Sequence, residues 1–329
     1  MSNAEQPFSF DVPCYQKKIR IKEDQMVWDH HRSGWKYAIS GLQTLHRDNG
    51  ILFEGYLDGH FWFDRVVNEP FVGFFHNAPE HPEEVSAKYR RIRSLRRLLE
   101  TDAWQHSSRR CLGLFALSNY LGDFLKEKTG LPVSVVKHPT ATVEEVFDFD
   151  EFIGNDNKRA FCIGHWMRDF ETFFQVRTDD LRKCLLLGGA EKDDHDVVNK
   201  YMLKHPDTIK YDYLPDWEYD YMLTENIAFV PMYDASANNV VIECIIRGTP
   251  ILINRMPAAA EYLGEDYPFF FDDVEDATRK INDMELIEEA ARYLREKDKS
   301  FLSLEKFVND FVESEVYRGL KVATPLPML

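Results

Sequence analysis

The sequence predicts an α/β fold in two domains, and three observations support this prediction. The chain has 329 residues, which is more than a single hydrophobic core usually serves, so two domains of about 150 residues each are expected. Hydrophobic residues make up 44% of the chain and aromatic residues 14%, enough to fill two cores. Short apolar runs alternate with longer amphipathic stretches, which is typical of strands and helices around parallel sheets.

Four apolar runs in the first half are predicted strands. They cover residues 50–56, 71–76, 111–117 and 132–137. A helix is expected between the last two runs, because Ser118 or Asn119 can cap its N-terminus. Gly130 suits the left-handed position that ends a helix, and Pro132 forbids its continuation.

The acidic stretch 144–158 has no clean period and is predicted to be a linker. Domains are therefore expected over residues 1–150 and 151–329. Predicted strands of the second domain cover residues 160–164, 183–187, 227–232 and 251–254. A helix is expected near residues 194–204, and a long helical tail follows Leu286, with its last helix a candidate to cross back to the first domain.

Charge and cysteine content exclude several classes of protein. The formal charge of −16 argues against a nucleic-acid partner, which needs an excess of Lys and Arg. The five cysteines are odd in number and far apart, as expected for reduced thiols and not for disulfides or a zinc site. The first 25 residues lack a hydrophobic signal, and no apolar run of about 18 residues occurs. A cytoplasmic protein is expected.

One basic run, residues 88–97, stands out from this acidic background. As a helix face it would suit an anionic acceptor or peripheral contact with an anionic membrane. The alternative is a solvated face paired with nearby acids.

The most informative segment is residues 233–250, with the sequence Tyr-Asp-Ala-Ser-Ala-Asn-Asn-Val-Val-Ile-Glu-Cys-Ile-Ile-Arg-Gly-Thr-Pro. Its flanks predict a helix, because Asn238 and Asn239 suit the N-cap and Gly248 suits the C-terminal end. This helix would follow a strand and direct unpaired backbone amides, including that of Val240, at the carboxyl edge of the sheet. The segment therefore predicts a diphosphate site.

Glu243 falls within this otherwise apolar helix. A lone buried carboxylate would cost roughly several kcal/mol unless it has partners. Two alternatives stay open: the hydroxyl groups of a ribose supply the partners, or Glu243 forms an ion pair with Arg247 or Arg255.

These residues resemble the donor-binding segment of retaining GT-B glycosyltransferases, broadly of glycosyltransferase family 4. In that family a strand, a loop, a glutamate-bearing helix, Gly-Thr-Pro and a strand follow in this order. The resemblance implies two Rossmann-like domains facing across a cleft, with the acceptor in the first and a nucleotide-sugar donor in the second. It implies that Glu243 binds the donor ribose, that the amides of Asn239 and Val240 meet the diphosphate, and that Thr249, in the turn that follows, is also a donor-binding residue.

The family pattern also has an earlier glutamate, whose expected position is Ala235 in this chain. Either Asp234, one residue before it, takes that role, or Asn238 holds the donor sugar. Residues 214–217, including Asp216, occupy the place of the family's base-binding loop.

Residues 160–169 resemble the first strand and loop of the family's donor domain. The resemblance implies that Arg168, after Gly164, contacts the diphosphate. A guanidinium can neutralise the charge that develops on a leaving diphosphate, so no metal is expected. The alternative is a surface ion pair of Arg168 with Asp169 or Glu171.

In the first half, residues 28–35 lie where the family has a glycine-containing loop over the reaction centre, with His31 and Gly34 on the acceptor side. His76 ends a predicted strand and is the candidate that hydrogen-bonds the sugar or the acceptor; the alternative is a structural histidine. The adjacent His30 and His31 would point to opposite faces of a strand, which weakens any metal site.

The resulting prediction is a metal-independent glycosyltransferase without a cofactor, which moves a sugar from a nucleotide-diphosphate donor to a hydroxyl of a glycan or similar acceptor. Its predicted catalytic residues are His76, Asp234 and Arg168. Two alternatives are a sugar-nucleotide epimerase on the same fold and a non-catalytic nucleotide-sugar-binding protein. A nicotinamide dehydrogenase is disfavoured, because no Gly-x-Gly-x-x-Gly follows a first strand.

Overall fold

The computed structural model describes residues 17–24, 34–80, 94–188 and 192–321. These residues form two compact units, which are described separately below. The first unit contains the described residues up to Glu80, those from 94 to Ala141, and those from Ser300 onward. The second unit runs from Thr142 to Lys299. The chain enters the second unit at Thr142 and returns to the first unit at Ser300, whereas domains were expected over residues 1–150 and 151–329.

The first unit is built on a parallel sheet of five strands, in the order β1-β2-β3-β4-β5. The strands are β1 (Ile19–Ile21), β2 (Ile51–Glu54), β3 (Phe71–Phe74), β4 (Cys111–Ala116) and β5 (Val133–Val135). Its first helices are α1 (Trp35–Leu42), α2 (Leu57–Trp62), α4 (Leu95–Leu99), α5 (Asp102–Ser108) and α6 (Asn119–Thr129). The four strands predicted in the first half are all present.

Helix α6 shows how local sequence sets an element in this unit. Ser118 Oγ accepts a hydrogen bond from the Leu121 amide, which is the expected N-cap. Gly130 ends the helix with a φ of 67°, a conformation that glycine adopts at little cost. Both predicted ends of this helix are therefore confirmed.

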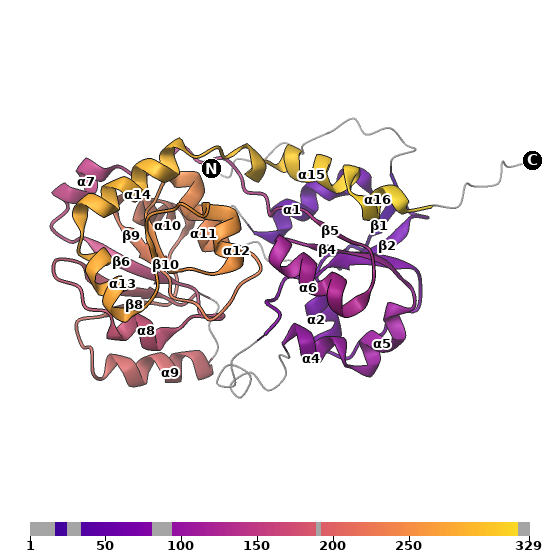
Figure 1. Cartoon of the computed structure of the whole chain (residues 1–329), viewed down its shortest axis with the longest axis horizontal. Helices are drawn as coiled ribbons and strands as arrows, with labels where there is room; N and C mark the ends of the chain where they lie inside the picture. The colour runs from indigo at the N-terminus through magenta and orange to yellow at the C-terminus, as the bar shows by residue number, and fades with distance from the viewer. Residues whose placement is uncertain (1–16, 25–33, 81–93, 189–191, 322–329) are drawn as a thin grey trace, which may run out of the picture. The chain divides into compact units, whose positions relative to one another are not determined.

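The C-terminal helices α15 (Leu304–Glu313) and α16 (Glu315–Gly319) belong to the first unit (Figure 1). Phe311 of α15 stacks on Phe115 of β4 with ring centroids 4.4 Å apart, and both side chains are buried. A Cβ at Gly41 would lie 2.7 Å from Leu304 Cδ1, so α1 and α15 pack closely at this glycine. These contacts place α15 against the core of the first unit.

The second unit has a six-stranded parallel sheet in the order β11-β10-β9-β6-β7-β8. Its strands are β6 (Arg159–Ile163), β7 (Arg182–Leu186), β8 (Ile209–Tyr211), β9 (Ile227–Phe229), β10 (Ile251–Asn254) and β11 (Phe270–Phe271). Its helices are α7 (Phe149–Gly154), α8 (Phe170–Gln175), α9 (Lys192–Met202), α10 (Asp216–Glu225), α11 (Asn239–Arg247), α12 (Pro257–Leu263), α13 (Val274–Ile281) and α14 (Met284–Glu296). The chain winds outward from β6 to β8 and then returns to add β9 beside β6, which makes this pair the switch point of a doubly wound sheet.

The stretch 144–158 is not the structureless linker that the sequence suggested. It contains α7, whose N-terminus is capped by Asp148 and whose Phe152 side chain is fully buried. This short helix could not be predicted from the sequence, because its segment is acidic and has no periodic apolar face. It packs through one buried aromatic side chain, that of Phe152.

Two further features concern the predicted environment of the chain. The described cysteines, Cys111, Cys162, Cys184 and Cys244, are free thiols with buried side chains, as the sequence predicted. Among the described residues, every helix is too short or too polar to cross a membrane.

Candidate functional site

The candidate site lies at the carboxyl ends of β6 and β9 in the second unit, where ligands of open α/β sheets bind. Two loops meet there, residues 164–169 after β6 and residues 230–238 after β9. The Asp169 amide donates to Pro231 O at 3.0 Å, and the Tyr233 amide donates to Met167 O at 3.0 Å. The loops are therefore joined by backbone hydrogen bonds on both sides of Arg168.

Arg168 is buried, with 7% of its surface exposed. Its Nε donates to Ile163 O at 2.7 Å, and its Nη1 donates to Trp166 O at 3.0 Å and to Met232 Sδ at 3.3 Å. No carboxylate pairs with this guanidinium in the described part of the chain. Asp169 instead caps α8 by accepting from Thr172. The predicted alternative, a surface ion pair of Arg168, is therefore wrong.

The β6–α8 loop is shaped around this guanidinium. Gly164 has a φ of 82°, and a Cβ placed there would lie 3.1 Å from Arg168 Nη2. Met167 has a φ of 58°, a backbone conformation that costs a side-chain-bearing residue roughly 1–3 kcal/mol. A strained loop around a buried cation that has no carboxylate partner among the described residues makes this a candidate site for an anion.

Helix α11 begins beside this cation. Asn238 is its N-cap, and its Oδ1 accepts from the amides of Val240 at 3.0 Å and Val241 at 3.4 Å. Asn238 Nδ2 donates to Met232 Sδ at 3.4 Å, so one sulfur atom contacts both Asn238 and Arg168. The structure thus confirms the helix and its cap. It corrects the expectation for the Val240 amide, which is already bonded, and leaves the Asn239 amide without an acceptor among the described residues.

Glu243 lies one turn into α11 and is fully buried. Its carboxylate forms an ion pair with Arg247, which also pairs with Asp220 of α10. The structure thus shows the ion-pair alternative for Glu243. A ribose would have to share this carboxylate with Arg247. Asp220 could not be identified as a partner from the sequence, because it lies on another helix, 23 residues before Glu243.

Three other predicted donor residues differ in where they lie. Thr249 is fully buried beyond the far end of α11, where its hydroxyl donates to Leu223 O at 2.5 Å. Thr249 therefore has a structural contact and is not part of this site. Asp234 lies half-buried in the loop after β9 and accepts a hydrogen bond from the Ala235 amide at 2.8 Å. Asp216 is exposed as the first residue of α10.

In the first unit, His76 follows β3 and its ring is held by neighbours. Nε2 lies 2.9 Å from Gly55 O, and since a carbonyl only accepts, Nε2 carries the proton. Burial lowers the pKa of His76 to about 3, so the ring is neutral and Nδ1 presents a lone pair. His76 can therefore accept a hydrogen bond at Nδ1, but it is a poor general base near neutral pH.

The other acceptor-side residues are only partly described. Gly34 is the buried N-cap residue of α1, with an extended backbone. His31 lies outside the described residues, and so do residues 88–93 of the basic run. Arg96, at the end of that run, pairs with Glu80 and lies over the Phe124 ring, which matches the expected pairing with nearby acids at that residue.

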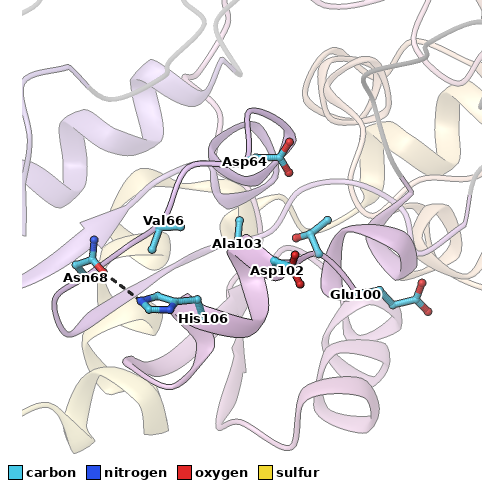
Figure 2. Close-up of a pocket in the computed structure, with 8 residues that line it drawn as sticks. Asp64, Val66, Asn68, Glu100, Asp102, Ala103 and His106 are labelled. Atoms are coloured by element: carbon cyan, nitrogen blue, oxygen red, sulfur yellow. Dashed lines mark hydrogen bonds between the residues drawn. The ribbon is translucent and has the colours of Figure 1, made fainter.

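A separate hollow on the first unit is acidic (Figure 2). It is lined by Asp64, Val66, Asn68, Glu100, Thr101, Asp102, Ala103 and His106. His106 Nε2 and Asn68 Oδ1 lie 3.2 Å apart across one side of it. Three carboxylates would repel a diphosphate, so this hollow does not suit the predicted donor. The described residues include no group of three or more His, Cys, Asp or Glu side chains arranged to hold a metal ion.

Comparison with known proteins adds to this geometry at the level of the fold. No family model matches the chain, and no curated protein matches it. Among solved structures, sucrose-phosphate synthase from Thermosynechococcus elongatus superimposes with a TM-score of 0.58 at 12% identity, covering 89% of this chain and 86% of that one. Anabaena Alr3699/HepE in complex with UDP and glucose gives a TM-score of 0.56 at 12% identity, covering 85% and 75%.

A variant of TarM from S. aureus, in complex with fondaparinux, alpha-GlcNAc-glycerol and UDP, gives a TM-score of 0.57 at 13% identity. That match covers 86% of this chain and 58% of TarM, so this protein spans little more than half of TarM's length. Identities this low establish the fold alone. The chain has the α/β fold of the GT-B glycosyltransferases, with two Rossmann-like units.

Proposed function

We propose that this protein is a glycosyltransferase that moves a sugar from a nucleotide-diphosphate donor to a hydroxyl of a glycan or similar acceptor. The observation that supports this most is the buried Arg168 guanidinium, which has no carboxylate partner in the described chain and lies at the switch point of the second sheet. Anion binding would compensate the cost of burying this cation. Two of the three similar structures described above contain UDP, which fits such a site.

In the proposed reaction, the bond between the sugar's anomeric carbon and the phosphate oxygen breaks, and a bond to the acceptor oxygen forms. The acceptor hydroxyl loses its proton, and the nucleoside diphosphate leaves with additional negative charge. Arg168 and the Asn239 amide would stabilise that charge at the start of α11. The order of strand, helix, Gly-Thr-Pro and strand around Glu243 supports a relation to glycosyltransferase family 4.

Binding of a nucleotide sugar is the direct test. Melting temperatures should be measured with UDP-, GDP-, CMP- and TDP-linked sugars, each in large excess. At about 100 times its dissociation constant a true donor adds about 2.7 kcal/mol, or roughly 5–10 °C for a unit of this size. Release of free nucleotide that depends on an added acceptor would separate a transferase from a binding protein, and a change of the sugar without acceptor would reveal an epimerase. If no nucleotide sugar raises the melting temperature, the proposed function is wrong.

Metal independence is a second expected result. If Arg168 and the start of α11 neutralise the leaving diphosphate, turnover with the identified donor should be the same with and without excess EDTA. The assay is nucleotide release in EDTA, followed by addition of magnesium as the control. Complete loss of activity in EDTA that magnesium restores would contradict this mechanism.

A further inference from the structure

We propose that Asp58 is the positioning residue that holds His76 in one orientation and one tautomer, with Nδ1 presented as a hydrogen-bond acceptor. In the reaction proposed above, on which this part rests, His76 is the candidate that hydrogen-bonds the sugar or the acceptor. Asp58 lies on α2 and is fully buried. This role cannot be read from the sequence, because an acid in the first turn of a helix is also what the helix dipole favours.

The first step is the way that β3 ends. The Phe75 amide still donates to Phe115 O of β4 at 3.1 Å, as in a continuing ladder. The next two amides are instead bound by one carboxylate: the His76 amide donates to Asp58 Oδ2 at 2.7 Å, and the Asn77 amide donates to Asp58 Oδ1 at 3.2 Å. Asp58 thus fixes the backbone on which the His76 ring is carried.

The second step concerns the His76 ring, which is hydrogen-bonded by the same turn between β2 and α2. His76 Nε2 donates to Gly55 O at 2.9 Å, three residues before Asp58. The close approach of this turn to β3 depends on Gly73, since a Cβ there would lie 2.3 Å from Glu54 O. Backbone and ring are therefore held from one segment of four residues, Gly55 to Asp58.

The third step is the packing around the ring. Trp35 and Tyr56 both meet His76 edge to face, with ring centroids at 4.4 Å and 5.2 Å. Trp35 is fully buried. A ring flanked in this way cannot turn over without losing both contacts and the bond to Gly55 O. With the proton on Nε2, Nδ1 is the unprotonated nitrogen of the ring and has the chemistry of an acceptor.

Nitrogen NMR of ring-labelled histidine tests this directly, without any donor. The chain has 11 histidines, and the His76 signals are identified by their loss in His76→Gln. In the wild type, His76 should be neutral with the proton on Nε2. Each Asp58 oxygen accepts one of the two amides, and Asp58→Asn replaces one of these oxygens by an NH2 group, so one amide loses its acceptor. In this variant both His76 tautomers should appear, and hydrogen exchange at the His76 and Asn77 amides should accelerate at least about tenfold.

Ser107→Ala is the matched control. Ser107 is also buried in the first unit, and its Oγ accepts from the Val67 amide at 2.9 Å. This substitution removes a buried acceptor for a backbone amide but touches no partner of His76, so the His76 tautomer should stay as in the wild type. An Asp58→Asn protein with the wild-type tautomer and wild-type exchange would overturn the proposal, as would a tautomer change in Ser107→Ala equal to that in Asp58→Asn.

If Asp58→Asn fails to fold, amide hydrogen exchange of the wild-type protein tests the role of Asp58 instead. The amides of His76 and Asn77 should then exchange as slowly as that of Phe74 within β3, and rapid exchange at either one would overturn the proposal. These readouts need no nucleotide sugar. A protein that binds no donor but shows the expected tautomer would refute the proposed function alone, whereas donor turnover with a mixed His76 tautomer in the wild type would refute only the role of Asp58.

Discussion

Replacing Arg168 by methionine should lower glycosyl transfer by roughly 10²-fold or more, because it removes a charged contact to the leaving diphosphate. Nucleotide affinity should fall by about 10- to 150-fold, the equivalent of a charged hydrogen bond worth about 1.5–3 kcal/mol. The protein should stay folded. The substitution loses hydrogen bonds to Ile163 O and Trp166 O, but it also removes a buried cation that has no carboxylate partner in the described chain, and these two changes oppose each other.

Arg255→Met is the matched control for this experiment. Arg255 directly follows β10 at the same edge of the sheet, but its side chain is 47% exposed and pairs with Glu265. This variant should change the dissociation constant and kcat/KM by less than about threefold, as expected for an exposed ion pair. Titration calorimetry and a nucleotide-release assay on the two variants measure both quantities. Near-normal values for Arg168→Met would place the diphosphate elsewhere.

Replacing Arg247 by methionine should have the largest effect on stability, lowering the free energy of unfolding by about 3–5 kcal/mol. The reason is that two carboxylates share this guanidinium: the Glu243 and Asp220 side chains are 1% and 7% exposed, and the substitution leaves both buried without it. For a unit of this size the melting temperature should drop by roughly 6–20 °C. Calorimetry of the ligand-free protein measures this.

Lys306→Met is the control for Arg247→Met. Lys306 also pairs with an acid four residues away, Asp310, but both side chains are well exposed. Its removal should cost only about 0.3–0.5 kcal/mol. If Arg247→Met melts no lower than Lys306→Met, the buried ion pairs contribute little, and the account of α11 given above is wrong.

Glu243→Gln, measured beside these variants, separates a structural glutamate from a ribose ligand. Arg247 keeps Asp220 as a partner when Glu243 is neutral, so stability should change by less than about 1.5 kcal/mol. The informative quantity is the nucleotide dissociation constant. An increase of about 10- to 150-fold would support the ribose contact that the family resemblance implies, and an unchanged value would assign Glu243 to the core alone.

Local sequence was sufficient for the elements whose ends carry their own signals. The N-caps Ser118 and Asn238 and the left-handed Gly130 and Gly248 lie where the residue types predicted them, because capping depends on atoms within a few residues of the chain. The alternation of apolar runs likewise determined the α/β class. The helix within 144–158 was missed because its stability comes from burying Phe152, and not from a periodic face.

The contact partners of buried side chains could not be predicted from the sequence, because they depend on which helices and strands become neighbours. Arg168 was expected either at a diphosphate or in an ion pair with Asp169 or Glu171, and only the packing of the β6 and β9 loops shows it buried against carbonyls and Met232 Sδ. Thr249 was likewise predicted as a donor-binding residue, but in the structure its hydroxyl donates a hydrogen bond to Leu223 O.

The sequence by itself thus determined the α/β class, most strands, the ends of α6 and α11, and a short set of candidate residues for a diphosphate, because these follow from composition, period and capping. The tertiary structure alone decided which of those residues meet: Asp220 reaches Arg247 across 27 positions, and Asp58 reaches the His76 amide across 18. The physical reason is that the pairing of buried charges and amides is settled by the crossing of helices and strands, which brings distant residues within hydrogen-bond distance and excludes water from them.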